Sequence, residues 1–148
     1  MWYYQGKEFD PDEDFLKPYQ GFVYEITELS TGKKYIGKKF FWKPKILPIT
    51  KTRKRRQRTT VQSDWREYFG SNQELQLLVE NTGVDNYHRN VLVLCRNKSE
   101  CAYWEAKLQF EKDVLLRNEY YNEFIGCKIN AKHLKDLQID RSSDDFKK

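Results

Sequence analysis

Residues 21–38 read GFVYEITELSTGKKYIGK, and this stretch decides the predicted fold. Because side chains alternate along an extended backbone, Phe22, Tyr24 and Ile26 are expected to share one face of a strand. The Ser-Thr-Gly sequence at 30–32 supplies the turn chemistry of a β-hairpin. We therefore predict a hairpin with strands at roughly 21–28 and 33–40.

Two tyrosines, Tyr24 and Tyr35, would come close together across this hairpin. Gly37 follows Tyr35 by two residues and removes a side chain from the same face, as the close approach of a substrate backbone would require. Tyrosine pairs are also common in ordinary cross-strand packing. The pair with its glycine suggests phosphodiester chemistry, a hypothesis that the rest of the chain has to support.

Further motifs follow the hairpin in order. They are DWREYFGSN at 64–72, a short helix ending near Gly83, an apolar strand at 91–95, a helix that holds Glu105, and Tyr121-Asn122. With Phe-Val-Tyr at 22–24 and Tyr-Ile-Gly-Lys at 35–38, this order resembles the GIY-YIG nuclease family. It is closest to the Seg-type (SegE-like) free-standing homing endonucleases of T-even phages, over roughly residues 20–130. Phe22 departs from the pattern, since the family usually has glycine at that position.

The resemblance implies an α/β (α+β) fold: a small GIY-YIG-like domain with a three-stranded antiparallel sheet flanked by helices, and a basic loop or arm inserted after the second strand. We divide the chain into an aromatic and acidic N-terminal strap at 1–19, a nuclease domain at 20–137 with the basic insertion at 40–63, and a polar tail at 138–148. A chain of 148 residues is long enough to fold as one domain without metals or disulfides.

Two helices are expected around the apolar strand at 91–95. Ser71 and Glu74 form a capping box that predicts the start of the first helix, and Gly83 predicts its end. Ser99 is the expected cap of the second helix. The core stripe of that second helix is predicted to consist of Ala102, Tyr103, Ala106, Phe110 and Val114.

The net charge of +5 is very unevenly distributed. The segment 30–63 has no acidic residue and twelve of the 27 lysines and arginines, which leaves 15 basic against 22 acidic residues elsewhere. Such a segment repels itself, so we predict a mobile arm or long loop that a polyanion neutralises. The predicted nucleic-acid-binding residues are Lys39, Lys43, Lys45, Lys51, Arg53, Lys54, Arg55, Arg56 and Arg58. A plain solvated loop is the alternative for this segment.

The resemblance also implies roles for individual residues. The implied catalytic set is Tyr24, Tyr35, Lys38, Arg66, Glu105 and Asn122. In the family the first tyrosine is proposed to activate water and the second to orient it or the phosphate. Because a free phenol has a pKa near ~10, Tyr24 would need nearby cations for this role, and Lys38 could supply one. Arg66 is the expected site arginine, with the arginines of 53–58 as alternatives.

Glu105 is the expected metal ligand. A carboxylate suits a hard ion such as Mg²⁺ or Mn²⁺, and one protein ligand is enough when phosphate and waters fill the remaining positions. The spacings of the three cysteines and two histidines do not match a zinc finger. The alternative for Glu105 is a solvent-facing glutamate on a helix.

These features and the resemblance predict a metal-dependent DNA endonuclease that acts on double-stranded DNA, and the resemblance implies that it is phage-encoded and of homing type. A nucleic-acid-binding protein that kept the fold but does not cut is the first alternative, because the first motif is altered. An adaptor that binds a partner protein through its aromatic segment is the second. The odd number of cysteines and the absence of a leader or an apolar span predict a reducing host cytoplasm and no membrane. The sequence leaves open whether the chain is a monomer or a homodimer.

Overall fold

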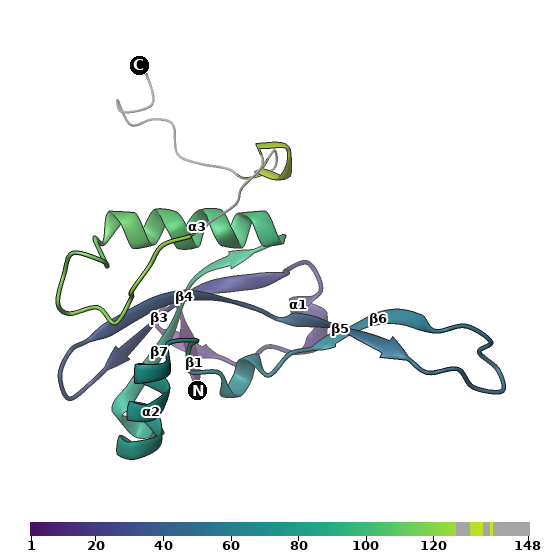
Figure 1. Ribbon diagram of the computed structural model, residues 1–148, viewed down its shortest axis with the longest axis horizontal. Helices are drawn as coiled ribbons and strands as arrows, with labels where there is room; N and C mark the ends of the chain where they lie inside the picture. Colours follow the sequence, from purple (N-terminus) through teal and green to yellow (C-terminus); the bar gives the residue numbers. More distant parts are fainter. Residues whose placement is uncertain (127–130, 135–136, 138–148) are drawn as a thin grey trace.

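A computed structural model describes residues 1–126, 131–134 and 137, so the predicted tail at 138–148 lies outside the described residues. The main sheet has five strands in the order β2-β1-β7-β3-β4 (Figure 1). Its strands are β1 (Trp2–Tyr4), β2 (Lys7–Phe9), β3 (Gly21–Glu28), β4 (Lys34–Phe40) and β7 (Tyr87–Cys95). All neighbours in this sheet are antiparallel except β1 and β7. The α/β fold class is therefore confirmed.

The hairpin predicted from residues 21–38 is β3–β4, in which Tyr24 lies opposite Gly37. The apolar run 91–95 lies in β7 at the centre of the sheet, where both faces are covered. The sheet has five strands instead of the expected three because the N-terminal segment forms β1 and β2. Trp2 is 2% exposed, and its indole Nε1 donates to the carbonyl oxygen of Trp65 at 2.8 Å. The predicted strap is thus built into the sheet and the core.

Helices cover both faces of the sheet, with α3 on one side and α2 on the other (Figure 1). The helices are α1 (Glu13–Leu16), α2 (Gln73–Thr82) and α3 (Lys98–Glu111), with short 3-10 helices η1 (Trp65–Glu67), η2 (Val84–Asn86) and η3 (Ala131–Leu134). Val23 and Ile36 pack in one cluster with Cys101 of α3. Phe22 and Tyr24 pack in the other with Leu75 of α2. Successive residues of the hairpin therefore face different helices.

The two longer helices begin one or two residues away from the predicted caps. The side chain of Asn72, not Ser71, accepts the Leu75 amide at α2. At α3 the side chain of Asn97, not Ser99, accepts the Glu100 amide. Phe110 is 63% exposed, so its predicted place in the core stripe is wrong, and the neighbouring Gln109 is buried instead. Gln109 is buried because its side-chain amide donates a hydrogen bond to the Ile36 carbonyl of β4.

The basic insertion is a two-stranded antiparallel ribbon instead of an irregular loop. It consists of β5 (Trp42–Leu47) and β6 (Gln57–Gln62), and it projects away from the body of the protein (Figure 1). The indole Nε1 of Trp42 donates to the Tyr19 carbonyl at 2.9 Å, and the Ser63 hydroxyl donates to the Phe40 carbonyl at 2.6 Å. These bonds fix the base of the ribbon at the end of β4.

Candidate active site

A pocket of about 590 Å³ opens at the outer edge of β4. Its walls come from β4, the segment before α2, helix α3 and the segment 122–126. The side chains that carry its chemistry are Tyr35, Lys38, Tyr68, Ser71, Glu105 and Asn122. β4 ends the order of the main sheet, and the segment 119–122 hydrogen-bonds along its outer edge, so this segment and α3 flank the pocket.

Lys38 and Glu105 form an ion pair on the α3 side of this pocket. Lys38 Nζ lies 3.0 Å from Glu105 Oε1, and the side chains are 32% and 13% exposed. Alternation along β4 turns Lys38 to the same side as Ile36, which packs with α3. Glu105 lies near the middle of α3, so a rigid helix holds its carboxylate at the pocket. The pair places one anion and one cation in a partly water-excluded space.

The two motif tyrosines lie side by side, with ring centroids 6.2 Å apart. Tyr24 is 0% exposed, and its hydroxyl oxygen is the one buried side-chain polar atom without a hydrogen-bond partner among the described residues. Burial raises the pKa of Tyr24 well above 10, with smaller contributions from the neighbouring Tyr68 and Tyr35 phenols. Tyr24 is therefore a neutral phenol in this structure.

Tyr35 is more accessible than Tyr24 and lines the pocket directly. Its hydroxyl lies 3.0 Å from the hydroxyl of Ser71, with which it shares a hydrogen bond. Burial raises the pKa of Tyr35 above 10, and the bond to Ser71 opposes this shift. Tyr35 is thus held as a neutral phenol whose orientation is set by the segment before α2.

Gly37 makes this arrangement sterically possible. A Cβ atom at residue 37 would lie 2.5 Å from the Tyr24 hydroxyl oxygen and 3.0 Å from Cε1 of Tyr35. Atoms that are not bonded do not approach so closely, so only glycine allows the Tyr24 phenol to lie against the backbone of β4. The group that approaches Gly37 is therefore a phenol of the protein itself, whereas the sequence predicted a substrate backbone at this position.

Asn122 continues the hydrogen bonding of the sheet with its side chain. Its Oδ1 accepts the Ile36 amide at 3.1 Å, and its Nδ2 donates to the Ile36 carbonyl at 2.7 Å. Gln109 Nε2 donates to the same carbonyl at 2.9 Å. Both amide side chains therefore fix β4 immediately before Gly37 and Lys38. Asn122 lines the pocket, but these bonds make it a residue that positions the strand.

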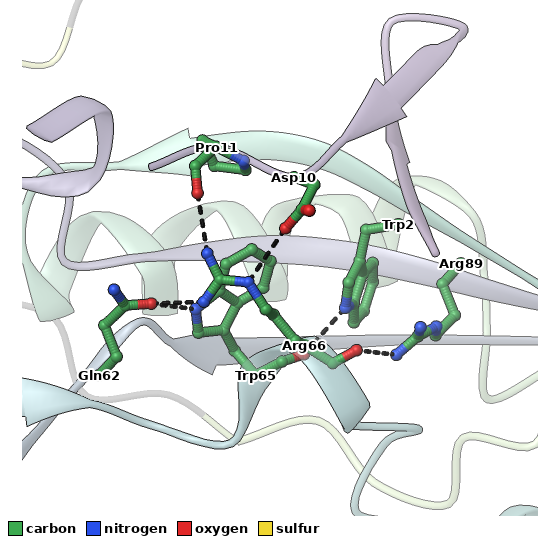
Figure 2. Close-up of polar contacts among 7 residues, drawn as sticks. All are labelled: Trp2, Asp10, Pro11, Gln62, Trp65, Arg66 and Arg89. Carbon is green, nitrogen blue, oxygen red and sulfur yellow. Dashed lines mark hydrogen bonds and ion pairs between the residues drawn. The ribbon is translucent and has the colours of Figure 1, made fainter. Parts of the chain in front are cut away.

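Arg66 lies outside the pocket, beside Trp65 on η1. Its Nε donates to Asp10 Oδ1 at 3.0 Å and its NH2 to the Pro11 carbonyl at 2.8 Å, and its NH1 donates to Gln62 (Figure 2). The guanidinium is thus occupied in joining the N-terminal segment to the end of β6. No arginine of the described residues lines the pocket. The structure therefore brings Tyr35, Lys38, Glu105 and Asn122 together, with Tyr24 beside them, but not Arg66.

Arg89 of β7, for which the sequence predicted no role, holds the wall of the pocket. Its guanidinium is buried between the rings of Trp2 and Phe69, at 4.7 and 4.1 Å from their centroids. Its NH1 donates to the carbonyls of Arg66 and Tyr68, both at 2.9 Å. Burial lowers the pKa of Arg89 to about 10. These bonds fix Tyr68, whose ring packs edge-on against Tyr24 with centroids 5.9 Å apart.

A second, basic groove of about 340 Å³ lies between the pocket and the ribbon. Four lysines line it: Lys38, Lys39, Lys43 and Lys98. Lys39 Nζ pairs with Asp64 at 2.7 Å, which lowers the pKa of that carboxyl. Lys38 lines both cavities, so a polyanion in the groove would meet the active pocket at this residue.

A sequence model of the family described as "Putative endonuclease segE, GIY-YIG domain" matches residues 2–125. The chain belongs to the GIY-YIG endonuclease family. No curated protein and no solved structure gives a significant match to it. GIY-YIG endonucleases are phosphodiester hydrolases, so the pocket at the edge of β4 is the candidate active site of such an enzyme. The helices in the described part of the chain are too short or too polar to cross a membrane.

Nucleases of the GIY-YIG family generally depend on a divalent metal ion. Among the described residues, no group of three or more His, Cys, Asp or Glu side chains could hold an ion by itself. Glu105 offers a single carboxylate at the pocket, paired with Lys38 through one oxygen. This donor set fits a hard ion that takes one protein ligand and completes its shell with phosphate and water. It does not fit a closed structural site.

Some GIY-YIG site residues could have been found with further sequence reasoning. Tyr68 and Ser71 lie within the DWREYFGSN motif at 64–72 that supports the family resemblance. Gln109 follows Glu105 by four residues, which places both on one face of a helix. Arg89 offered no comparable signal, because a single arginine in a strand is usually exposed.

Proposed function

We propose that this GIY-YIG endonuclease is a divalent-metal-dependent enzyme that cuts double-stranded DNA. The observation that carries the proposal is the convergence of Tyr35, Lys38 and Glu105 in one pocket, with the basic groove leading away from it. A duplex backbone running along the groove would present one phosphodiester to the pocket. The likeness to Seg-type enzymes of T-even phages supports a phage-encoded homing enzyme that acts in the host cytoplasm.

Glu105 is the residue proposed to hold Mg²⁺ or Mn²⁺. An ion bound there supplies positive charge for the transition state and the leaving oxygen. Lys38 adds a second positive charge beside the phosphate. With no arginine from the described residues in the pocket, Lys38 takes the electrostatic role expected of Arg66.

The tyrosines are proposed to position the reacting groups. Tyr35, oriented by its hydrogen bond with Ser71, is placed to donate to a phosphate oxygen or to hold the attacking water. Tyr24 has an unpartnered hydroxyl against Gly37, close to the same place. Burial keeps this phenol protonated, so Tyr24 can accept a proton from water only as its anion, after added positive charge has lowered its pKa and the phenol has released its own proton to solvent. Asn122 acts by holding β4 in place.

The proposal is tested with the purified chain and supercoiled plasmid in Mg²⁺ or Mn²⁺, with EDTA and with an RNA duplex as parallel arms. Nicked or linear plasmid that disappears in EDTA, with the RNA intact, is the expected result. Plasmid that is shifted in a gel but never cut, across metals and salt concentrations, would leave a binding protein with a nuclease fold. If the RNA duplex were cut as fast as the DNA, the proposal that the substrate is DNA would be refuted.

A further inference from the structure

Beyond its base, the ribbon of β5 and β6 packs against no other element in the described part of the fold. Its strands form a sheet of their own and extend away from the main body (Figure 1). Most of its side chains are exposed on both faces. An isolated pair of strands is only marginally stable in water, so a ribbon of this length is expected to have a binding partner.

The charge of the ribbon indicates the chemistry of that partner. Residues 42–62 contain eight lysines and arginines and no acidic residue. A polyanion would remove the repulsion between these charges. The ribbon begins at the basic groove, which leads to the active pocket, and on the proposed function this pocket takes a phosphodiester. The polyanion that fits the ribbon is therefore the nucleic acid that is being cut.

The strand register divides the ribbon into two faces. Residues directly opposite each other in an antiparallel pair share a face. Trp42 is paired with Gln62, and both are bound to the domain, Trp42 to the Tyr19 carbonyl and Gln62 to Trp65 and Arg66. The face of Trp42 and Gln62 is thus turned to the protein at its base. The other face carries Lys43, Lys45 and Leu47 opposite Val61, Thr59 and Gln57, and we name it the free face.

We propose that the ribbon lies in the major groove of B-form DNA with this free face toward the bases. The inference rests on the proposed function and adds to it the groove, the form of the duplex and a source of sequence preference. The major groove of B-DNA, about 12 Å wide, admits a two-stranded ribbon without deformation, whereas the minor groove, about 6 Å wide, takes one only when the duplex is bent or widened. The deep, narrow major groove of an A-form RNA duplex excludes it as well.

The four polar side chains of the free face, Lys43, Lys45, Gln57 and Thr59, match the hydrogen-bonding groups that the major groove displays. Lysine pairs with guanine O6 and N7, glutamine pairs with adenine N6 and N7, and threonine can bond to either. Lys45 lies opposite Thr59, so one donor and one adaptable hydroxyl would meet neighbouring base pairs. The arginines and lysines of the connecting loop at 51–56 remain for the phosphates on either side of the groove. The ribbon can therefore supply base readout without a separate recognition domain.

The length of the ribbon predicts where the readout lies. Six residue pairs at ~3.3 Å each extend about 20 Å from the base of the ribbon. At ~3.4 Å per base pair, this corresponds to about six base pairs of duplex. Because the basic groove separates the active pocket from the base of the ribbon and the ribbon leaves in one direction, the bases that are read lie to one side of the bond that is cut.

The test is a selection from duplexes with a randomised centre, using Glu105→Gln in Mg²⁺, followed by methylation interference with dimethyl sulfate on the enriched duplex. This reagent methylates guanine N7 in the major groove and adenine N3 in the minor groove. Wild-type protein then maps the cut on the same duplex. Thr59→Ala on the free face and Thr60→Ala on the opposite face are matched variants, since both shorten an exposed threonine at adjacent positions of β6.

We expect interference at guanine N7 over a stretch of about six base pairs that lies wholly on one side of the cut. Thr59→Ala, but not Thr60→Ala, should change the enriched sequence, and Lys45→Ala should weaken binding to the enriched duplex roughly five- to 150-fold more than to a scrambled one. The proposal is overturned by interference confined to adenine N3, by contacts centred on the cut, by an equal effect of the two threonine variants, or by failure to enrich any sequence. Binding with this pattern but without cutting would leave the groove assignment intact and refute the nuclease proposal alone.

Discussion

Gly37→Ala provides a direct test of the arrangement of the two tyrosines. The added Cβ would lie 2.5 Å from the Tyr24 hydroxyl oxygen and 2.9 Å from its Cζ, where an ordinary contact is at least ~3.4 Å. The phenol must therefore move by about 1 Å, in a region where Tyr24 is fully buried. Overpacking of this kind costs about 1–3 kcal/mol in the free energy of unfolding, measurable by urea denaturation.

The same displacement should reduce the rate of DNA cutting. A misplacement of about 1 Å in a reacting constellation can cost roughly 100-fold. The assay is single-turnover plasmid nicking at a temperature where the variant is folded. Gly21→Ala is the comparison variant, because its Cβ would lie 2.5 Å from the Lys39 carbonyl oxygen, where the start of β3 pairs with the end of β4 and no tyrosine of the pair is displaced. It should lose at least as much stability but keep the rate of the folded enzyme. A Gly37→Ala enzyme that cuts at the wild-type rate would refute the reasoning.

Three further predictions concern Tyr24, Arg66 and the ribbon. Tyr24→Phe removes a hydroxyl without a partner, so stability at neutral pH should not fall, while cutting should drop at least ~100-fold. Because burial raises the pKa of Tyr24 above 10, the wild type should lose unfolding free energy as pH rises above ~10, and the variant should lose less. Equal cutting rates of the variant and the wild type would show that Tyr24 takes no part in the reaction. Arg66→Ala should cost about 1–2 kcal/mol in urea unfolding and leave the cutting rate unchanged, whereas a fall of ~100-fold would place Arg66 in the reaction. Replacing Arg55 and Arg56 with glutamine should reduce the slope of log affinity against log salt by about 1.8 if each contacts one phosphate, and an unchanged slope in fluorescence anisotropy would contradict those contacts.

The parts of the fold that the sequence predicted are those where burial imposes a pattern. The β3–β4 hairpin alternates, and β7 contains an unbroken apolar run because both of its faces are covered. The strands β1 and β2 have only three residues each, too few to show alternation; β1 is held by β7 from far along the chain, and β2 pairs with β1. Such pairing depends on tertiary contacts that local sequence does not contain.

The ribbon was not predicted because it lacks the burial that imposes a pattern on the hairpin and on β7. Both of its faces are exposed, so no apolar alternation marks it, and Pro44 argued against a regular element. A proline is tolerated because both strands of an isolated pair are edge strands. The run Thr59-Thr60-Val61 has high β-propensity, which was the available signal.

The candidate site was predicted as far as the family resemblance reached. The resemblance predicted that the helix with Glu105 packs against the hairpin, and in the structure Tyr35, Lys38 and Glu105 line one pocket. The position of Arg66 depends on Asp10 and on the end of β6, two contacts that a sequence cannot reveal. Phe110 shows a similar limit: helical periodicity placed it in the core, but the hydrogen bond of Gln109 to the sheet fixes the rotation of α3.

Glu105→Gln, compared with Glu111→Gln in a plasmid-cutting assay with Mg²⁺, tests the central claim most directly. Both glutamates lie on α3 and pair with lysines, but Glu105 lies at the pocket and Glu111 is exposed on the surface. If Glu105 holds the metal ion at the site of hydrolysis, its variant should bind DNA with wild-type affinity and lose cutting, while Glu111→Gln cuts normally. Equal cutting by the two variants would contradict the account.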